Sequence, residues 1–127
     1  MAADDLKNFY GRYIEAINSR QFDLVEQMVA EDVTMNDRPH KRADVLASLR
    51  SMVEAVPDWK WTVHELFTED DRIAARLQDS GTPVKTFLGH EPTGAAVDIM
   101  EYASYRVREG QFVEMRYAAR KSRKQAR

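Results

Sequence analysis

The spacing of apolar residues divides the chain into two parts with different periods. In the first part, apolar positions recur every three or four residues, which is the repeat of a helix with one buried face. This spacing predicts a helix through residues 6–17, a short helix over 23–30 and a longer helix over 42–56. Pro57 ends the last helix, because proline lacks the amide hydrogen that a helix interior needs. A short strand is expected at 33–36.

After Pro57 the period changes from 3.6 to 2, which is the repeat of a strand. The first alternating run predicts a strand with one buried face, made of Trp59, Trp61, Val63 and Phe67. Further strands are expected over 72–80, 96–108 and 112–119, with a short one at 86–88 and turns at 70–71 and 109–110. Helices that precede a run of strands predict an α+β fold with an antiparallel meander, because parallel strands would need helices between them.

Three amphipathic helices must then cover one face of a bent sheet. Such a sheet forms a cone, and the open end of the cone is expected to make a small-molecule pocket. The length of 127 residues fits one domain, with 43% hydrophobic and 31% charged residues.

The cysteine count and the chain's beginning narrow the classes of protein. Without cysteine there is no disulfide framework and no thiolate chemistry. No apolar run approaches the ~20 residues that span a membrane, and the first residues lack a signal-peptide pattern. We therefore expect a cytoplasmic protein with no membrane partner. His40, His64 and His90 are isolated from one another in the sequence, so we expect no metal and no other cofactor.

Charge is unevenly distributed along the chain. The last ten residues carry five basic and no acidic side chains, whereas the preceding 117 carry 14 basic and 21 acidic ones. A basic tail can bind nucleic acid, but the acidic body would repel it, so we expect a frayed, solvated terminus and no nucleic-acid partner. The expected organisation is a domain over 1–118 and a basic, disordered tail over 119–127.

Several segments resemble the SnoaL-like polyketide cyclases. The run from Val63 to Arg76 is similar to the family's strand–turn–strand. Residues 81–83 (GTP) with 87–94 (FLGHEPTG) resemble its "GTH…FLG-x-x-PTG" connection, and 105–114 (YRVREGQFVE) resembles its last hairpin. Residues 30–33 and 56–58 also fit. The likeness covers roughly 5–118 and implies a cone-shaped α+β barrel, in the superfamily of nuclear transport factor 2 and ketosteroid isomerase, that is usually a homodimer.

The resemblance breaks off at the positions that carry the family's chemistry. The family's catalytic histidine position holds Pro83, its tryptophan position Arg116 and its catalytic aspartate position Arg120. Proline and arginine cannot replace an imidazole or carboxylate that moves a proton. The resemblance therefore implies the fold and a pocket without the family's mechanism.

Glu101 is the first candidate for acid–base chemistry. It lies in mid-strand on the same parity as Val97, Ile99 and Tyr105. An ionised carboxylate on an apolar face is costly unless it is paired, so burial could tune Glu101 for proton transfer. The alternative is a structural ion pair with Arg76 or Arg116 on neighbouring strands.

The two sources of inference disagree about the last strand. Periodicity puts Val113, Met115 and Tyr117 on the apolar face, whereas the resemblance turns Glu114 and Arg116 towards the pocket. We favour the pocket for Arg116, where a guanidinium would hold a carbonyl or anionic oxygen.

The remaining candidates lie at the expected mouth and wall of the cone. Asp37 is a second candidate proton carrier, although Asn and Asp at this point also suit a turn. The full set of candidate ligand-binding residues is Tyr13, Asn36, His40, Trp61, Arg76, Tyr105, Glu114 and Arg116.

Three kinds of function remain open from the sequence. The first is a cofactor-independent cyclase or isomerase that acts by acid–base chemistry on a small apolar or aromatic carbonyl compound. The second is a ligand-binding protein without turnover, and the third is a dimeric accessory protein. A homodimer is expected from the outer face of the sheet, on which we place Trp and Tyr side chains.

Overall fold

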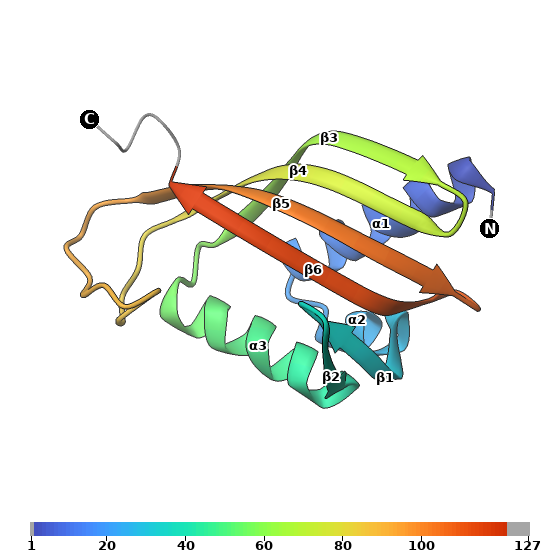
Figure 1. Cartoon of the computed structure of the whole chain (residues 1–127). Helices are drawn as coiled ribbons and strands as arrows, with labels where there is room; N and C mark the ends of the chain where they lie inside the picture. Colours follow the sequence, from blue (N-terminus) through green and yellow to red (C-terminus); the bar gives the residue numbers. More distant parts are fainter. Residues whose placement is uncertain (1, 122–127) are drawn as a thin grey trace.

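The strands after Pro57 form the predicted antiparallel meander, and three helices pack against it (Figure 1). The computed structural model describes residues 2–121. Its helices are α1 (Ala3–Asn18), α2 (Phe22–Met28) and α3 (Arg42–Ala55). Its strands are β1 (Val29–Met35), β2 (Arg38–Lys41), β3 (Lys60–Glu69), β4 (Arg72–Gly81), β5 (Val97–Arg108) and β6 (Gln111–Lys121).

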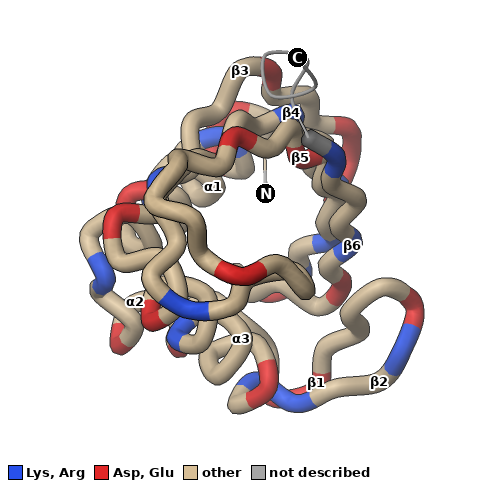
Figure 2. The backbone as a smooth tube through the Cα atoms, turned by 90° about the vertical axis from the view of Figure 1, so that its left-hand side faces the viewer, with Lys and Arg blue, Asp and Glu red and all other residues tan. Residues whose placement is uncertain are grey.

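The strands are ordered β2-β1-β6-β5-β4-β3 across one curved, unclosed sheet. Every neighbouring pair is antiparallel except β1 and β6, which are parallel. Viewed along the strands, the sheet and the helices surround a common axis (Figure 2). The predicted α+β cone with three helices on a mainly antiparallel sheet is confirmed.

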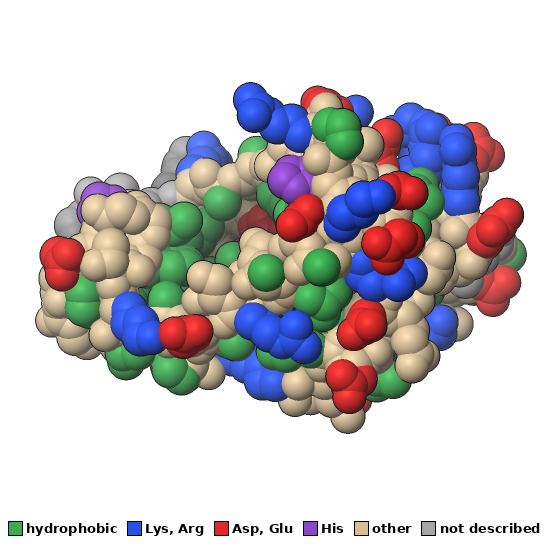
Figure 3. All heavy atoms as spheres, turned by 90° about the horizontal axis from the view of Figure 1, so that it is seen from below, with side chains coloured by type: hydrophobic (Ala, Val, Ile, Leu, Met, Phe, Trp, Pro, Cys, Tyr) green, Lys and Arg blue, Asp and Glu red, His purple; other side chains and the backbone are tan. Residues whose placement is uncertain are grey.

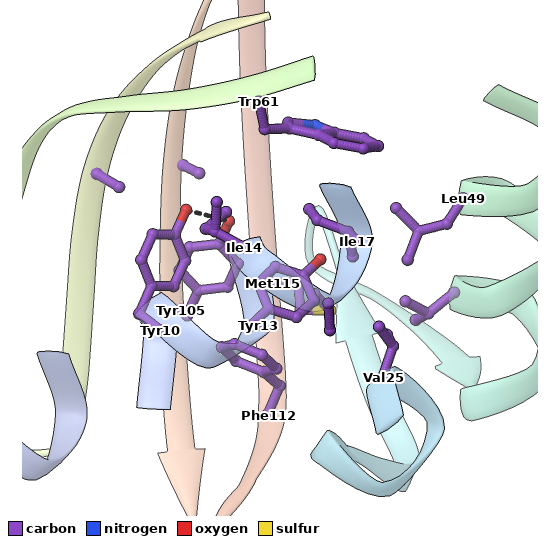
Figure 4. Packing of buried hydrophobic residues seen from close by; sticks show 14 of the residues in the cluster. Tyr10, Tyr13, Ile14, Ile17, Val25, Leu49, Trp61, Tyr105, Phe112 and Met115 are labelled. Atoms are coloured by element: carbon purple, nitrogen blue, oxygen red, sulfur yellow. Dashed lines mark hydrogen bonds between the residues drawn. The ribbon is translucent and has the colours of Figure 1, made fainter. Parts of the chain in front are cut away.

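Helix α1 contributes the largest part of the core from the helical layer. Its apolar stripe is buried against the inner face of the sheet. Asp4 and Asp5 lie in its first turn, where their negative charges interact favourably with the positive end of the helix dipole. The rings of Tyr10, Tyr13 and Tyr105 cluster around Phe112 (Figure 4). These aromatic contacts tie the first helix to the last two strands.

A β-hairpin that the sequence did not predict joins β1 and β2. Asn36 and Asp37 have φ angles of 49° and 68°, the left-handed conformation that a two-residue hairpin turn requires. Pro39 can follow because β2 is an edge strand. The short strand expected at 86–88 is wrong, since only an isolated bridge joins Phe87 and His90 there.

Two bulges shift the inward-facing positions of β3 and β6. In β3 the register shifts between Val63 and Glu65, so His64 is an extra residue. Odd-numbered residues face inward before this bulge, and even-numbered residues face inward after it. The prediction that Phe67 is buried is therefore wrong, because its side chain is 63% exposed on the outer face.

The second bulge lies in β6 and resolves the conflict over that strand. Val107 pairs with Phe112 and Arg106 with Glu114, so one residue of β6 is left over between them. Phe112 faces inward before the bulge, and Met115 faces inward after it.

Strand β6 continues beyond the predicted domain boundary at residue 118. It ends at Lys121, so its last three residues pair with β5 inside the segment for which a disordered tail was expected. The remainder of that expected tail, residues 122–127, lies outside the described residues. Within residues 2–121, no helix has the length and apolarity needed to cross a bilayer.

Candidate functional site

A cavity of about 280 Å³ lies between the inner face of the sheet, helices α1 and α3, and the connection from β4 to β5. It reaches the surface beside Leu88, which is 65% exposed, and beside Asn36 at the β1–β2 turn. Viewed from below, the molecule is hollowed, with apolar walls and an acidic side chain at depth (Figure 3). The interior is thus partly hollow, as expected for a small-molecule pocket.

Two carboxyl groups face this cavity from adjacent strands. Asp79 of β4 is opposite Ile99, and Glu101 of β5 is opposite Leu77, so the two acids are diagonal neighbours on the same face. Asp79 is 4% exposed and Glu101 8% exposed. Their side chains hydrogen-bond to each other, which requires a proton on one of them.

Burial, followed by the hydrogen bond and charge of Glu101, raises the pKa of Asp79 to about 10. Among the described residues, Oδ1 of Asp79 has no donor as a partner, so no protein group offsets the cost of ionising it. At neutral pH Asp79 therefore keeps its proton and can donate it, with a second carboxyl group beside it on the same cavity wall.

Phenol groups line the same cavity close to the acids. Tyr13 of α1 and Tyr105 of β5 are buried, and burial raises the pKa of both. The hydroxyl of Tyr105 lies 3.0 Å from that of Tyr10, which is behind the cavity wall (Figure 4). These phenols stay protonated at neutral pH and can donate hydrogen bonds.

Two tryptophans form part of the apolar wall. Trp59 and Trp61 stand edge to face, with ring centroids 6.3 Å apart, and Phe87 packs on Trp59 at 5.1 Å. Both tryptophans are buried on the inner side, which confirms the prediction from the strand period that they lie on the buried face. The expectation that tryptophan also lies on the outer, dimer-forming face is wrong. Nε1 of Trp59 is buried without an acceptor among the described residues.

Half of the residues predicted from the sequence line this cavity. They are Tyr13, Asn36, Trp61, Glu101 and Tyr105. The side chain of Asn36 also accepts a hydrogen bond from the backbone of Tyr117 at 2.8 Å, which holds the hairpin against β6.

The other five candidates lie outside the cavity. Asp37 and Arg116 pair at 2.7 Å, and Arg76 pairs with Glu65 on the outer face. Glu114 faces Arg72 at 3.7 Å, and His40 faces Asp44 at 3.3 Å. The expectation that Arg116 points into the pocket is wrong, because the bulge in β6 turns it outward. The proposed ion pair of Glu101 with Arg76 or Arg116 is wrong, because both arginines lie on the outer face and Glu101 lies on the inner one.

Asp79 is the site residue that the sequence reasoning missed. It continues the inward parity of Ile73, Ala75 and Leu77 along β4, so an alternation count carried to the end of the strand would have found it. Within residues 2–121, no three His, Cys, Asp or Glu side chains are grouped to hold a metal ion.

Comparison with known proteins identifies the family. The sequence profile of the SnoaL-like polyketide cyclases matches residues 7–122, nearly the whole chain. The chain belongs to the SnoaL-like polyketide cyclase family. No curated protein matches it in sequence.

Solved structures agree with this assignment at the level of the fold. A SnoaL-like polyketide cyclase from Agrobacterium tumefaciens strain C58 superposes with a TM-score of 0.86 at 23% identity, over 94% of this chain and 93% of that one. IdmH from Streptomyces antibioticus superposes with a TM-score of 0.79 at 23% identity, over 89% of this chain and 90% of that one. TsrD from Streptomyces laurentii superposes with a TM-score of 0.84 at 16% identity, over 94% of this chain and 90% of that one.

This SnoaL-like chain departs from the family at the positions already noted. Pro83 lies buried in the connection after β4, and Arg116 and Arg120 are exposed on β6. The acids that face the cavity come instead from β4 and β5. Family membership supports a cyclase- or isomerase-like small-molecule fold.

Proposed function

We propose that the protein is a cofactor-independent cyclase or isomerase that uses Asp79 and Glu101 as an acid–base pair on a small apolar carbonyl compound. The observation that carries this proposal is the buried carboxyl pair that faces an open cavity. Acid–base enzymes commonly keep two carboxyl groups in different protonation states, so that each has its own task.

The proposed step moves one proton off carbon and one onto oxygen. The carboxylate of the pair removes a proton from the carbon beside the substrate carbonyl, and the C–H electrons form the enol double bond. A proton is donated to the carbonyl oxygen, either by the protonated carboxyl of the pair or by the phenol of Tyr13 or Tyr105. Reprotonation at another carbon gives an isomer, and attack of the enol on a second carbonyl closes a ring.

Trp59 supports a carbonyl ligand independently of the acids. A buried indole N–H without an acceptor costs free energy, and a ligand oxygen in the cavity could compensate for it after a small adjustment of the ring.

The test is deuterium exchange into the methyl group of 2-acetylnaphthalene in D₂O at neutral pD, followed by NMR. The wild type should accelerate exchange, and Asp79→Asn and Glu101→Gln should each reduce the acceleration by ~100-fold or more. Asp98→Asn, at a carboxylate of β5 that lines neither the cavity nor the outer groove, is the matched control and should exchange at the wild-type rate.

Equal exchange rates in all four proteins would reject the acid–base assignment. Binding of the ketone without any exchange would instead favour the alternative function, a ligand-binding or accessory protein with no turnover.

We also propose that the protein is a homodimer joined through the outer face of the sheet. Phe67 is 63% and Tyr102 44% exposed there, beside a groove that Arg76 and Arg116 also line. Each arginine stands next to an acid, so the surface carries both charges and can complement a second copy of itself. The cytoplasmic location expected from the sequence stays a prediction.

A further inference from the structure

The ionisable groups that line the cavity are all acids. Asp79 and Glu101 are accompanied by the phenols of Tyr13, Tyr105 and Tyr117, and no Lys, Arg or His is among the described residues that line it. This composition is unusual for a site that would hold an anion, because anionic ligands are commonly held by guanidinium or ammonium groups.

The arginines nearest in the fold are committed elsewhere. Arg20 packs behind the wall, 5.9 Å from the Trp61 ring, and donates to the carbonyl oxygens of Pro57 and Trp59 at 2.8 and 2.7 Å. Arg76 and Arg116 are held by acids on the outer face. The two carboxyl groups thus have no cationic partner among the described residues that line the cavity.

The aromatic wall adds to this preference for positive charge. Trp59, Trp61, Phe87 and Tyr105 all line the cavity. Aromatic faces attract cations, most strongly when the cation has left bulk water, and tryptophan attracts them best. Two buried carboxyl groups, one of them with an unpartnered oxygen, and several aromatic rings therefore converge on one small space.

We propose that the cavity takes an organic cation, an apolar aromatic body with a protonated nitrogen that lies against Asp79 and Glu101. This inference rests on the proposed function in that both need a ligand to reach the carboxyl pair, and it adds a charge preference to the ligand class. An anionic ligand of the same shape would meet uncompensated negative charge and should be rejected.

Binding of a cation should be linked to release of a proton. In the free protein Asp79 holds its proton at neutral pH, and a positive charge beside it favours its ionisation. The other titratable groups that face the pair are Tyr13 from α1, Tyr105 from β5 and Tyr117 from β6, and burial keeps the pKa of each above its usual value. Affinity should therefore rise by up to ~10-fold per pH unit between pH 6 and 8.

The test compares four ligands with one naphthalene body: 2-naphthylmethylamine, 2-naphthylmethanol, 2-acetylnaphthalene and 2-naphthoate. Isothermal titration calorimetry in two buffers of different ionisation enthalpy gives affinity and the number of protons released. We expect the amine to bind at least tenfold more tightly than the alcohol, with release of up to one proton, and the carboxylate not to bind. Asp79→Asn should abolish proton release, whereas Asp98→Asn, at a carboxylate that lines neither the cavity nor the outer groove and accepts hydrogen bonds from Gln78, should leave both quantities unchanged.

The outcomes separate this inference from the proposed function. If the ketone and alcohol bind as well as the amine, with no proton release, the cation preference is overturned and the acid–base proposal stands. If 2-naphthoate binds as tightly as the amine, the charge argument is also overturned. If none of the four binds, the cation inference is overturned, and the deuterium-exchange assay then decides the proposed function separately.

Discussion

At the scale of single residues, Asp79 is the group whose environment costs the fold most and gives the site its chemistry. Its carboxyl is removed from water and has only another carboxyl beside it. Such a residue is expected where a buried group serves chemistry at the expense of stability.

Asp79 should make the protein less stable as pH rises. Its pKa is higher in the folded protein than in the unfolded chain, so the folded state binds more protons between pH ~4 and 10, and the free energy of unfolding falls across that range. Asp79→Asn should remove this slope. The difference in free energy of unfolding between the variant and the wild type should therefore shift in favour of the variant by up to about 4 kcal/mol from pH 5 to pH 8.

Urea unfolding at both pH values measures this change. Asp98→Asn is the control, since Asp98 lies half-buried on the same pair of strands and accepts hydrogen bonds from Gln78. A wild type and Asp79→Asn that lose stability equally with pH would contradict the burial argument.

At the scale of elements, strand and helix types followed from the periodicity, but the facing of β3 along its whole length did not. The alternation that places Glu101 inward holds along all of β5. In β3 the bulge at His64 adds one residue, and a two-residue period cannot reveal such an insertion, so Phe67 was wrongly placed inward. In β6 the period correctly placed Met115 inward, whereas the family resemblance turned Arg116 towards the pocket because it does not reveal the bulge in that strand.

The turns show the same limit. Asn36 and Asp37 suited a turn in the sequence, but the hairpin that they form depends on pairing of β1 with β2, which contains Pro39. The sequence could predict that the cone encloses a cavity. It could not predict that the two acids lie next to each other, because that depends on the register between β4 and β5.

The end of β4 should be sensitive to a single methyl group. A Cβ on Gly81 would lie 2.5 Å from Cγ1 of Val56 and 2.9 Å from Oδ1 of Asp58. Gly81→Ala should therefore destabilise the protein by about 1–3 kcal/mol, because the strand end packs directly on the connection after α3.

Chemical denaturation tests this with an internal control. Gly11 lies in α1 with nothing within 4 Å of an added Cβ, so Gly11→Ala should stabilise the helix by up to about 1 kcal/mol. Equal effects of the two substitutions would show that close packing at Gly81 does not matter.

At the scale of the whole molecule, the two faces of the sheet have separate tasks. The inner face forms the core and the cavity, and the outer face carries exposed aromatic side chains among paired charges. A partner on the outer face would leave the cavity mouth beside Leu88 free, since that mouth lies between α3 and the connection after β4.

The proposed dimer should dissociate when charge is added at its centre. Tyr102→Glu places a carboxylate in the outer groove and, in two copies, sets like charges against each other. Sedimentation velocity at high micromolar concentration should show a wild-type dimer and a Tyr102→Glu monomer. Leu24→Glu, at an exposed leucine on α2, is the control and should remain dimeric. A monomeric wild type would reject the dimer.

The claim on which the account depends is that Asp79 keeps its proton at neutral pH, beside Glu101, in a cavity that ligands can enter. Carbon-13 NMR titration of the Asp79 side-chain carboxyl carbon tests it directly. We predict that this carbon titrates far above the usual range of an aspartate, near pH 10. Ionisation of the Asp79 carboxyl below pH 5 would contradict the account.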